Sequence, residues 1–196
     1  QINAAINIET WKSTWQKIVE RHAILRTTYG IDEQGEPLQI VHQTIDIPME
    51  VIEATDWNEE QLNNEILAKA DIPFDLENGP VIKLYLLKLS STEFVQLLTM
   101  HHIANDEVTM GLLLTEFKKL YAGIPLEPPV PYADFCDWQS KLLNSPQGEE
   151  LWQYWKKQLA GELPILNLPT DKPRPKVQTY RGDVHRFQVN EKLVSQ

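Results

Sequence analysis

Cysteine is nearly absent from this 196-residue chain: Cys136 is the only one, so no intramolecular disulfide can form. That fits a protein of the reducing cytoplasm. No run approaches the roughly 18 consecutive apolar residues of a membrane span, and no basic-then-apolar leader opens the sequence. Basic residues are outnumbered, with 18 Lys and Arg against 28 Asp and Glu and a formal charge of −10. Because nucleic acids and anionic membranes bind basic surfaces, we expect neither as a partner.

What remains is the composition of an ordinary soluble globular domain, with 42% hydrophobic and 23% charged residues. The length suffices to bury a sizeable core. Cys136 lies in a helical stretch, 132–143, without a base nearby. Because a free cysteine usually behaves as a small buried hydrophobe, we predict that Cys136 packs in the core and is not a nucleophile.

Hydrophobic periodicity predicts helices alternating with hairpins. An amphipathic helix carries an apolar stripe made of Trp11, Trp15, Ile18, Val19 and His22. A second helix is expected from Asp56, with Glu59 as its capping-box partner, to a point before Pro73. The remaining predicted segments are strands 26–29 and 37–43 around a turn at 32–35, strand 47–52, strands 81–89 and 93–100, helix 108–121, a proline-rich linker at 163–175 and a strand at 182–189. A further helix is expected between Ser145, its N-cap, and Gly161, just past its end. This order indicates an α/β (α+β) two-layer sandwich with a mixed, largely antiparallel sheet.

Two adjacent histidines, His101 and His102, stand where the strand 93–100 gives way to a helix. Neighbouring side chains at a strand end point to opposite sides, so only one ring can face a given cleft. A neutral imidazole there is a natural proton acceptor near pH 7. Asp106 immediately precedes the helix and is placed either to cap it or to take part in chemistry. We predict no metal site, because adjacent histidines do not share a face.

Five ordered segments carry a resemblance to a known family. HHIANDEVT, from His101, resembles the HHxxxDG-type signature of condensation domains of nonribosomal peptide synthetases, which are relatives of chloramphenicol acetyltransferase-like enzymes. The other four segments are RHAILRTTY from Arg21, PFDLENGPVIKLYLLKL from Pro73, PYADFCDWQ from Pro131, and LPTDKPRP followed by YRG from Leu168. The resemblance runs almost end to end.

The resemblance implies a chloramphenicol acetyltransferase-like lobe. Residues 1–166 would be the N-terminal lobe of a condensation domain, and residues 167–196 the linker and the start of the C-terminal lobe, the rest of which is absent. Such a domain joins a donor acyl or peptidyl group to an acceptor aminoacyl group through an amide bond. It binds no cofactor of its own, since both substrates arrive on phosphopantetheine arms. The implied partners are upstream and downstream peptidyl carrier proteins, an adjacent adenylation domain and the C-terminal lobe.

Carried over residue by residue, the resemblance makes His102 the catalytic residue, which would accept a proton from the attacking amine or orient it. His101, Asp106 and Arg26 would support the loop and the lobe. Glu107 stands where the family usually has glycine, and Thr109 replaces a serine, so these two are the candidate modulators of activity.

Two alternatives stay open. One is a condensation-like domain that does not condense and instead docks carrier proteins or a tailoring enzyme; Glu107 favours it. The other is an epimerisation domain, which uses the same histidine. Such domains typically carry a tryptophan where this chain has Met110, so the sequence favours condensation.

Overall fold

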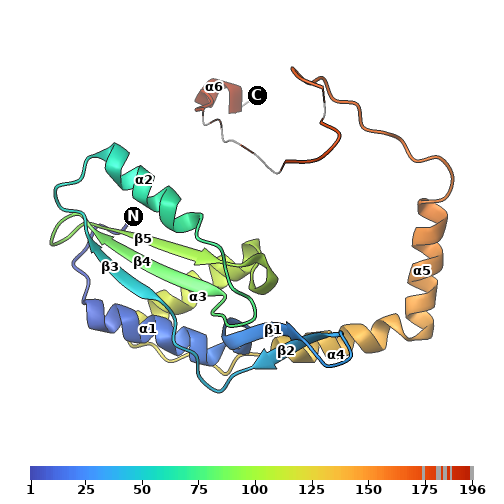
Figure 1. Ribbon diagram of the computed structural model, residues 1–196, viewed down its shortest axis with the longest axis horizontal. Coiled ribbons are helices and arrows are strands. Elements are labelled where there is room, and N and C mark those ends of the chain that lie inside the picture. Colours follow the sequence, from blue (N-terminus) through green and yellow to red (C-terminus); the bar gives the residue numbers. More distant parts are fainter. Residues whose placement is uncertain (174, 180–181, 183–184, 186, 195–196) are drawn as a thin grey trace. The chain divides into compact units, whose positions relative to one another are not determined.

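The computed structural model of the chain describes residues 1–173, 175–179, 182, 185 and 187–194 (Figure 1). They fall into two units, 1–145 and 146–196. The lobe boundary predicted at 166/167 stays a prediction. Within the described ranges, no helix has both the length and the apolar character needed to cross a membrane.

A three-stranded mixed sheet organises the first unit. Strands β3 (Met49–Glu53), β4 (Ile82–Lys88) and β5 (Phe94–Met100) lie in the order β3-β4-β5. β3 pairs with β4 in parallel, and β4 pairs with β5 antiparallel, with Ile82 opposite Met100. The polar residues 90–92 connect β4 to β5 in a tight hairpin. The predicted α/β fold with a mixed sheet is therefore confirmed.

Helices α1 (Ile8–Arg21) and α3 (Glu107–Tyr121) cover one face of this sheet (Figure 1). Alternate residues of β4 point toward them, as the pleat requires. Both buried indoles of α1 donate to the same side chain on β5: the distances to Gln96 Oε1 are 2.7 Å from Trp11 Nε1 and 3.3 Å from Trp15 Nε1. The main core consists of buried side chains from these elements, among them Trp11, Trp15, Ile18, Val19, Leu84, Leu86 and Leu113.

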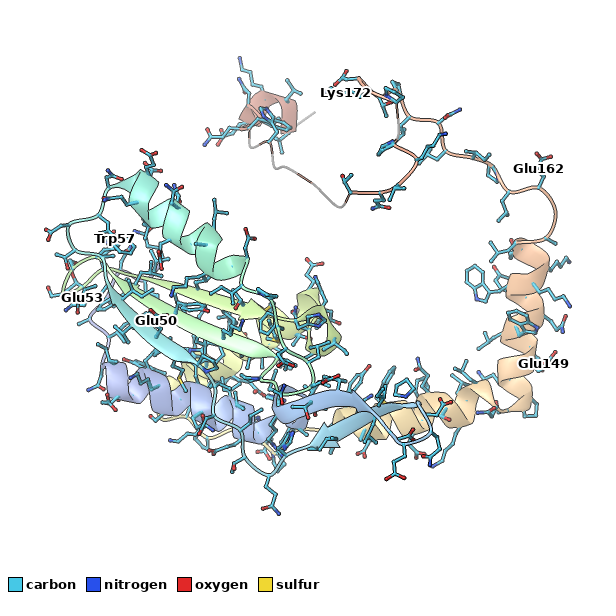
Figure 2. The ribbon with its side chains drawn as sticks, viewed as in Figure 1. Glu50, Glu53, Trp57, Glu149, Glu162 and Lys172 are labelled. Carbon is cyan, nitrogen blue, oxygen red and sulfur yellow. The ribbon has the colours of Figure 1, made fainter. Side chains whose placement is uncertain are left out.

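Helix α2 (Glu59–Ala70) covers the other face, where Tyr85 and Leu87 of β4 point (Figure 1). Trp57, labelled in Figure 2, precedes the helix and packs on this second cluster. The predicted start at Asp56 with Glu59 as capping partner is wrong. Residues 55 and 56 form a turn, and the capping box is made by Asn58 and Gln61, whose side chains each accept from the other's backbone N–H. The N-cap therefore lies two residues later than predicted, at Asn58 instead of Asp56.

A second, two-stranded antiparallel sheet pairs β1 (Thr27–Ile31) with β2 (Pro37–Val41). A short 3-10 helix, η1 (Ala23–Arg26), connects α1 to it. Asp32 Oδ1 accepts from the backbone N–H groups of Gln34 (2.9 Å) and Glu36 (2.8 Å), which closes the predicted turn. The predicted hairpin is therefore confirmed.

Helix α4 (Tyr132–Leu143) forms as the sequence predicts, but residues 132–141 are exposed. Cys136 is exposed as well, so the prediction that it packs in the core is wrong. The physical reason is that no residue of α4 is buried, so the helix offers no core position to a cysteine. Its aromatics contact one another along the helix instead: Tyr132 and Trp138 each lie 5.6 Å from Phe135, measured between ring centroids.

The second unit contains α5 (Pro146–Gln158), which confirms the helix predicted between Ser145 and Gly161. It also contains α6 (Glu191–Val194), a single turn that the sequence did not predict. The strand predicted over 182–189 lies partly outside the described residues, since 183, 184 and 186 are not among them.

Candidate functional site

A pocket of about 510 Å³ opens in the first unit, beside the histidine motif. Three segments far apart in the sequence build its wall: the end of α1 with η1, the turn after β5 with the first half of α3, and the segment before α4. The lining residues are Arg21, His22, Ala23, Ile24, Arg26, His102, Ile103, Ala104, Asn105, Asp106, Thr109, Leu112, Pro129, Val130, Pro131 and Tyr132.

The end of β5 separates the two motif histidines. The His101 backbone N–H donates to Val81 O at 2.9 Å and so continues the β4–β5 ladder by one residue. Its Nδ1 accepts from the Ile103 N–H at 3.1 Å, and the half-buried ring meets Phe74 edge-on at 6.0 Å. The chain then turns into η2 (His102–Ala104), which places His102 on the pocket wall with an exposed side chain. His101 is not among the lining residues.

The hydrogen bond of His102 indicates which ring nitrogen carries the hydrogen and which keeps a lone pair. His102 Nδ1 lies 3.3 Å from Asn105 O. A carbonyl oxygen can only accept, so Nδ1 carries the hydrogen and, in the neutral ring, Nε2 keeps its lone pair. At 3.3 Å the bond is longer than the usual N–H···O distance and orients the ring only loosely. The arrangement can accept a proton at Nε2.

Asp106 caps α3. Its Oδ1 accepts from the backbone N–H of Thr109 at 2.8 Å and from the Thr109 hydroxyl at 2.6 Å. These hydrogen bonds, the hydroxyl one first, lower the pKa of the Asp106 carboxyl below its usual 3.8. A carboxylate that is ionised and engaged in this way is a poor proton acceptor near pH 7. Of the two readings of Asp106, the structure shows the cap.

Glu107 is the first residue of α3; it is exposed and is not among the pocket-lining residues. An acidic group is favourable in the first turn of a helix. Arg26 lines the pocket and donates from its guanidinium to His42 O, which ties η1 to the end of β2. Its Nε is buried, and so is Asn105 Oδ1; neither atom has a hydrogen-bond partner within the part of the chain that the structure describes.

The sequence did not predict a buried ion cluster beside this pocket. Glu116 of α3 is 8% exposed, and its Oε2 lies 2.6 Å from His22 Nε2. Arg21 Nε lies 3.2 Å from both Glu116 oxygens, and another Arg21 nitrogen donates to Glu127 O. The available signal was the spacing of α3, where Glu116 falls on the same helical face as Leu113 and Leu120.

Known proteins resemble this chain both in fold and in sequence. The fold is that of condensation-domain structures, which are chloramphenicol acetyltransferase-like. The X-domain in the complex of the X-domain and OxyB from teicoplanin biosynthesis gives a TM-score of 0.78 at 26% identity, covering 92% of this chain and 41% of that chain. The epimerization domain from the third module of tyrocidine synthetase B gives 0.75 at 23% identity, over 87% of this chain and 40% of that chain.

The model of the Condensation domain family matches residues 1–196. Tyrocidine synthase 3 of Brevibacillus parabrevis is 37% identical over 195 residues, which cover 98% of this chain and 3% of that protein. The chain therefore belongs to the condensation-domain family of nonribosomal peptide synthetases. It spans only a few per cent of the length of the synthetases it matches.

Proposed function

We propose that residues 1–166 are the N-terminal lobe of a catalytic condensation domain, and that residues 167–196 lead into its C-terminal lobe. The domain would form an amide bond between a donor acyl or peptidyl thioester and an acceptor aminoacyl group. The observation that carries this proposal is the position of His102: it lies on the wall of a pocket of about 510 Å³, its Nδ1 is bonded to a backbone carbonyl, and its Nε2 has no hydrogen-bond partner among the described residues.

The chemistry follows from that geometry. The acceptor nitrogen attacks the donor thioester carbonyl, a C–N bond forms, and the C–S bond breaks. His102 Nε2 takes the proton that the nitrogen loses, and the departing thiolate is protonated. General-base help of this kind contributes roughly 10²–10⁴-fold. Holding two tethered reactants together contributes at least as much through effective molarity.

The partners follow from the family. Upstream and downstream carrier proteins would deliver the substrates on phosphopantetheine arms, so the domain needs no cofactor of its own. An adenylation domain would be adjacent, and the C-terminal lobe would complete the pocket. A cytoplasmic location agrees with a chain whose one cysteine is exposed and unpaired.

The remaining site residues would act by support. Asp106 fixes the start of α3 directly after the histidine turn. His101 holds that turn through its contact with the Ile103 N–H. Arg26 holds η1 against the end of β2. We assign none of the three a chemical step. Glu107 would leave the pocket unobstructed, since it is exposed and outside the lining.

A docking module is the second candidate. The X-domain, 26% identical, is found in a complex with OxyB, so a protein of this fold serves as a binding partner. An epimerisation domain is a third, because such a domain shares the fold. Met110, where those domains typically have tryptophan, weighs against it.

One experiment separates the three. The complete domain that contains this lobe is mixed with a donor-loaded and an acceptor-loaded carrier protein, and the released products are analysed by mass spectrometry and chiral chromatography. A dipeptidyl product supports condensation. Inversion at the α-carbon of a carrier-bound residue, without a new amide bond, would support epimerisation. Carrier or enzyme binding with neither product would support docking.

A further inference from the structure

A second histidine lines the pocket, and its ring is bonded to a buried carboxylate. His22 lines the pocket together with His102. Its Nε2 lies 2.6 Å from Glu116 Oε2. An ionised carboxylate can only accept, so Nε2 carries the hydrogen and Nδ1 of the neutral ring keeps its lone pair. Among the residues that the structure describes, none hydrogen-bonds to His22 Nδ1. This is the arrangement of a carboxylate-supported general base.

Four charged side chains of the described residues lie beside His22 or line the same pocket. Glu116 faces it from α3, and Arg21, its neighbour on α1, is paired with the same carboxylate. Arg26 and Asp106 also line the pocket. The Asp106 carboxylate is held by Thr109, which lowers its pKa. Among the described lining residues, the two imidazoles are therefore the groups whose hydrogen bonds leave one ring nitrogen with an open lone pair: Nδ1 of His22 and Nε2 of His102.

Condensation releases two protons from the acceptor nitrogen. An α-amine with an ordinary pKa of about 7.7–8.0 is mostly ammonium at neutral pH and has no lone pair for attack. The balanced reaction is ammonium plus thioester giving amide, thiol and one proton. One of the two protons ends on the departing sulfur, and the other leaves to solvent. One imidazole holds only one of them at a time.

We propose that His22 takes the first of these protons. The acceptor ammonium would transfer a proton to His22 Nδ1 and become the neutral amine. That amine would attack the thioester while His102 Nε2 accepts the second proton and passes it to the sulfur, and His22 would release its proton to water. Glu116 and Arg21 are positioning residues that hold the imidazole with Nδ1 free. This inference rests on the condensation function proposed above.

The pH dependence of the condensation rate of the complete domain tests whether His22 accepts the first proton and His102 the second. His22→Gln retains a donor that can reach Glu116 but removes the basic Nδ1. The matched control is His42→Gln, because His42 Nε2 is also bonded, to Thr28 Oγ1 at 2.8 Å, and His42 does not line the pocket. Single-turnover rates are measured from about pH 6.5 to pH 9, a range that spans the titration of the amine. Circular dichroism at each pH checks the fold.

We expect His22→Gln to be slower than wild type by about tenfold or more at pH 6.5 and within about twofold at pH 9, where the amine is neutral without help. His42→Gln should follow wild type throughout. A loss in His22→Gln that is the same at every pH, or no loss at all, would overturn the inference and leave the condensation function standing. No product from wild type would overturn both.

A measurement on the 196-residue chain tests the same point without turnover. Nitrogen-15 NMR of the imidazole rings reports which nitrogen of neutral His22 carries the hydrogen. We expect Nε2–H in wild type and a mixture of tautomers in Glu116→Gln. Observation of Nδ1–H in wild type would overturn the proposal even if His22→Gln does not fold, because Nδ1 would then have no lone pair to offer.

Discussion

Asp106 Oδ1 accepts from both the backbone N–H and the hydroxyl of Thr109, at 2.8 and 2.6 Å. The two bonds fix the first turn of α3 four residues after His102 and keep the carboxylate occupied. We predict that Asp106→Ala lowers the melting temperature by about 2–4 °C, as the loss of an N-cap does in a chain of this size. Asp106→Asn, which keeps a capping oxygen, should lose less.

The Asp106 cap also predicts a pH dependence. Its pKa is lowered in the folded chain, so its charge contributes stability that is complete above the unfolded value of 3.8 and is lost as the pH falls through the folded value. The stability difference between wild type and Asp106→Asn should therefore be constant above about pH 5 and shrink below pH 4. Urea unfolding at several pH values measures it. A difference that grows on acidification would contradict the assignment.

Glu116 should matter far more than an exposed glutamate. Removal of one partner from a buried ion pair leaves the other charge uncompensated, so we predict that Glu116→Ala destabilises the chain by about 3 kcal/mol. Glu50, labelled in Figure 2, is the matched control. Its Oε2 lies 2.7 Å from Lys69 Nζ, but its side chain is 50% exposed. Glu50→Ala should cost less than about 1 kcal/mol. Equal losses in urea unfolding would mean that the Glu116 cluster is not buried as described.

Gly79 is placed where a side chain does not fit. Its φ is 67°, and a Cβ there would lie 2.9 Å from Thr28 Cγ2 and 3.2 Å from Ile45 Cδ1. Gly35 has a φ of 85° but open space around it. We predict that Gly35→Ala costs about 1 kcal/mol for backbone strain, and that Gly79→Ala costs about 1–2 kcal/mol more for the added contact. Unfolding free energies that agree within error would contradict the close approach.

Glu107 is the departure from the family pattern that this structure explains most directly. Because its side chain is exposed and outside the pocket lining, both Glu107→Gly and Glu107→Gln should change the condensation rate by less than about tenfold, or roughly 1.4 kcal/mol in the barrier. The assay is dipeptidyl product from loaded carriers. A domain that condenses only after the change to glycine would show instead that Glu107 silences it.

Much of the fold could be predicted because the hydrophobic periodicity within each element indicates whether it is a helix or a strand. The spacing of Trp11, Trp15 and Ile18 matches a helix, and the apolar runs of β4 and β5 match strands. In the structure these segments pack together in the main core. The start of α2 was missed because two candidate caps, Asp56 and Asn58, lie close together, and a turn at 55–56 decides between them.

The candidate site was predictable only in part. The local order of strand, histidines and helix indicated the junction at His101 and His102, but it left Asp106 open between a cap and a chemical role; the structure shows the cap. The Glu116–His22 pair joins residues 94 positions apart, and a glutamate inside a helix is usually solvent-exposed. Nor does local sequence reveal that α4 is exposed, since burial of Cys136 depends on what packs against the helix.

The most direct test of the central claim is the single-turnover condensation rate of the complete domain with His102→Ala, measured beside His42→Ala as the matched control. If His102 Nε2 accepts the proton of the attacking amine, His102→Ala should lower the rate by about 10²-fold or more at neutral pH, while His42→Ala stays within about twofold of wild type. Dipeptidyl product that forms in His102→Ala at the wild-type rate would contradict the chemical role assigned to His102.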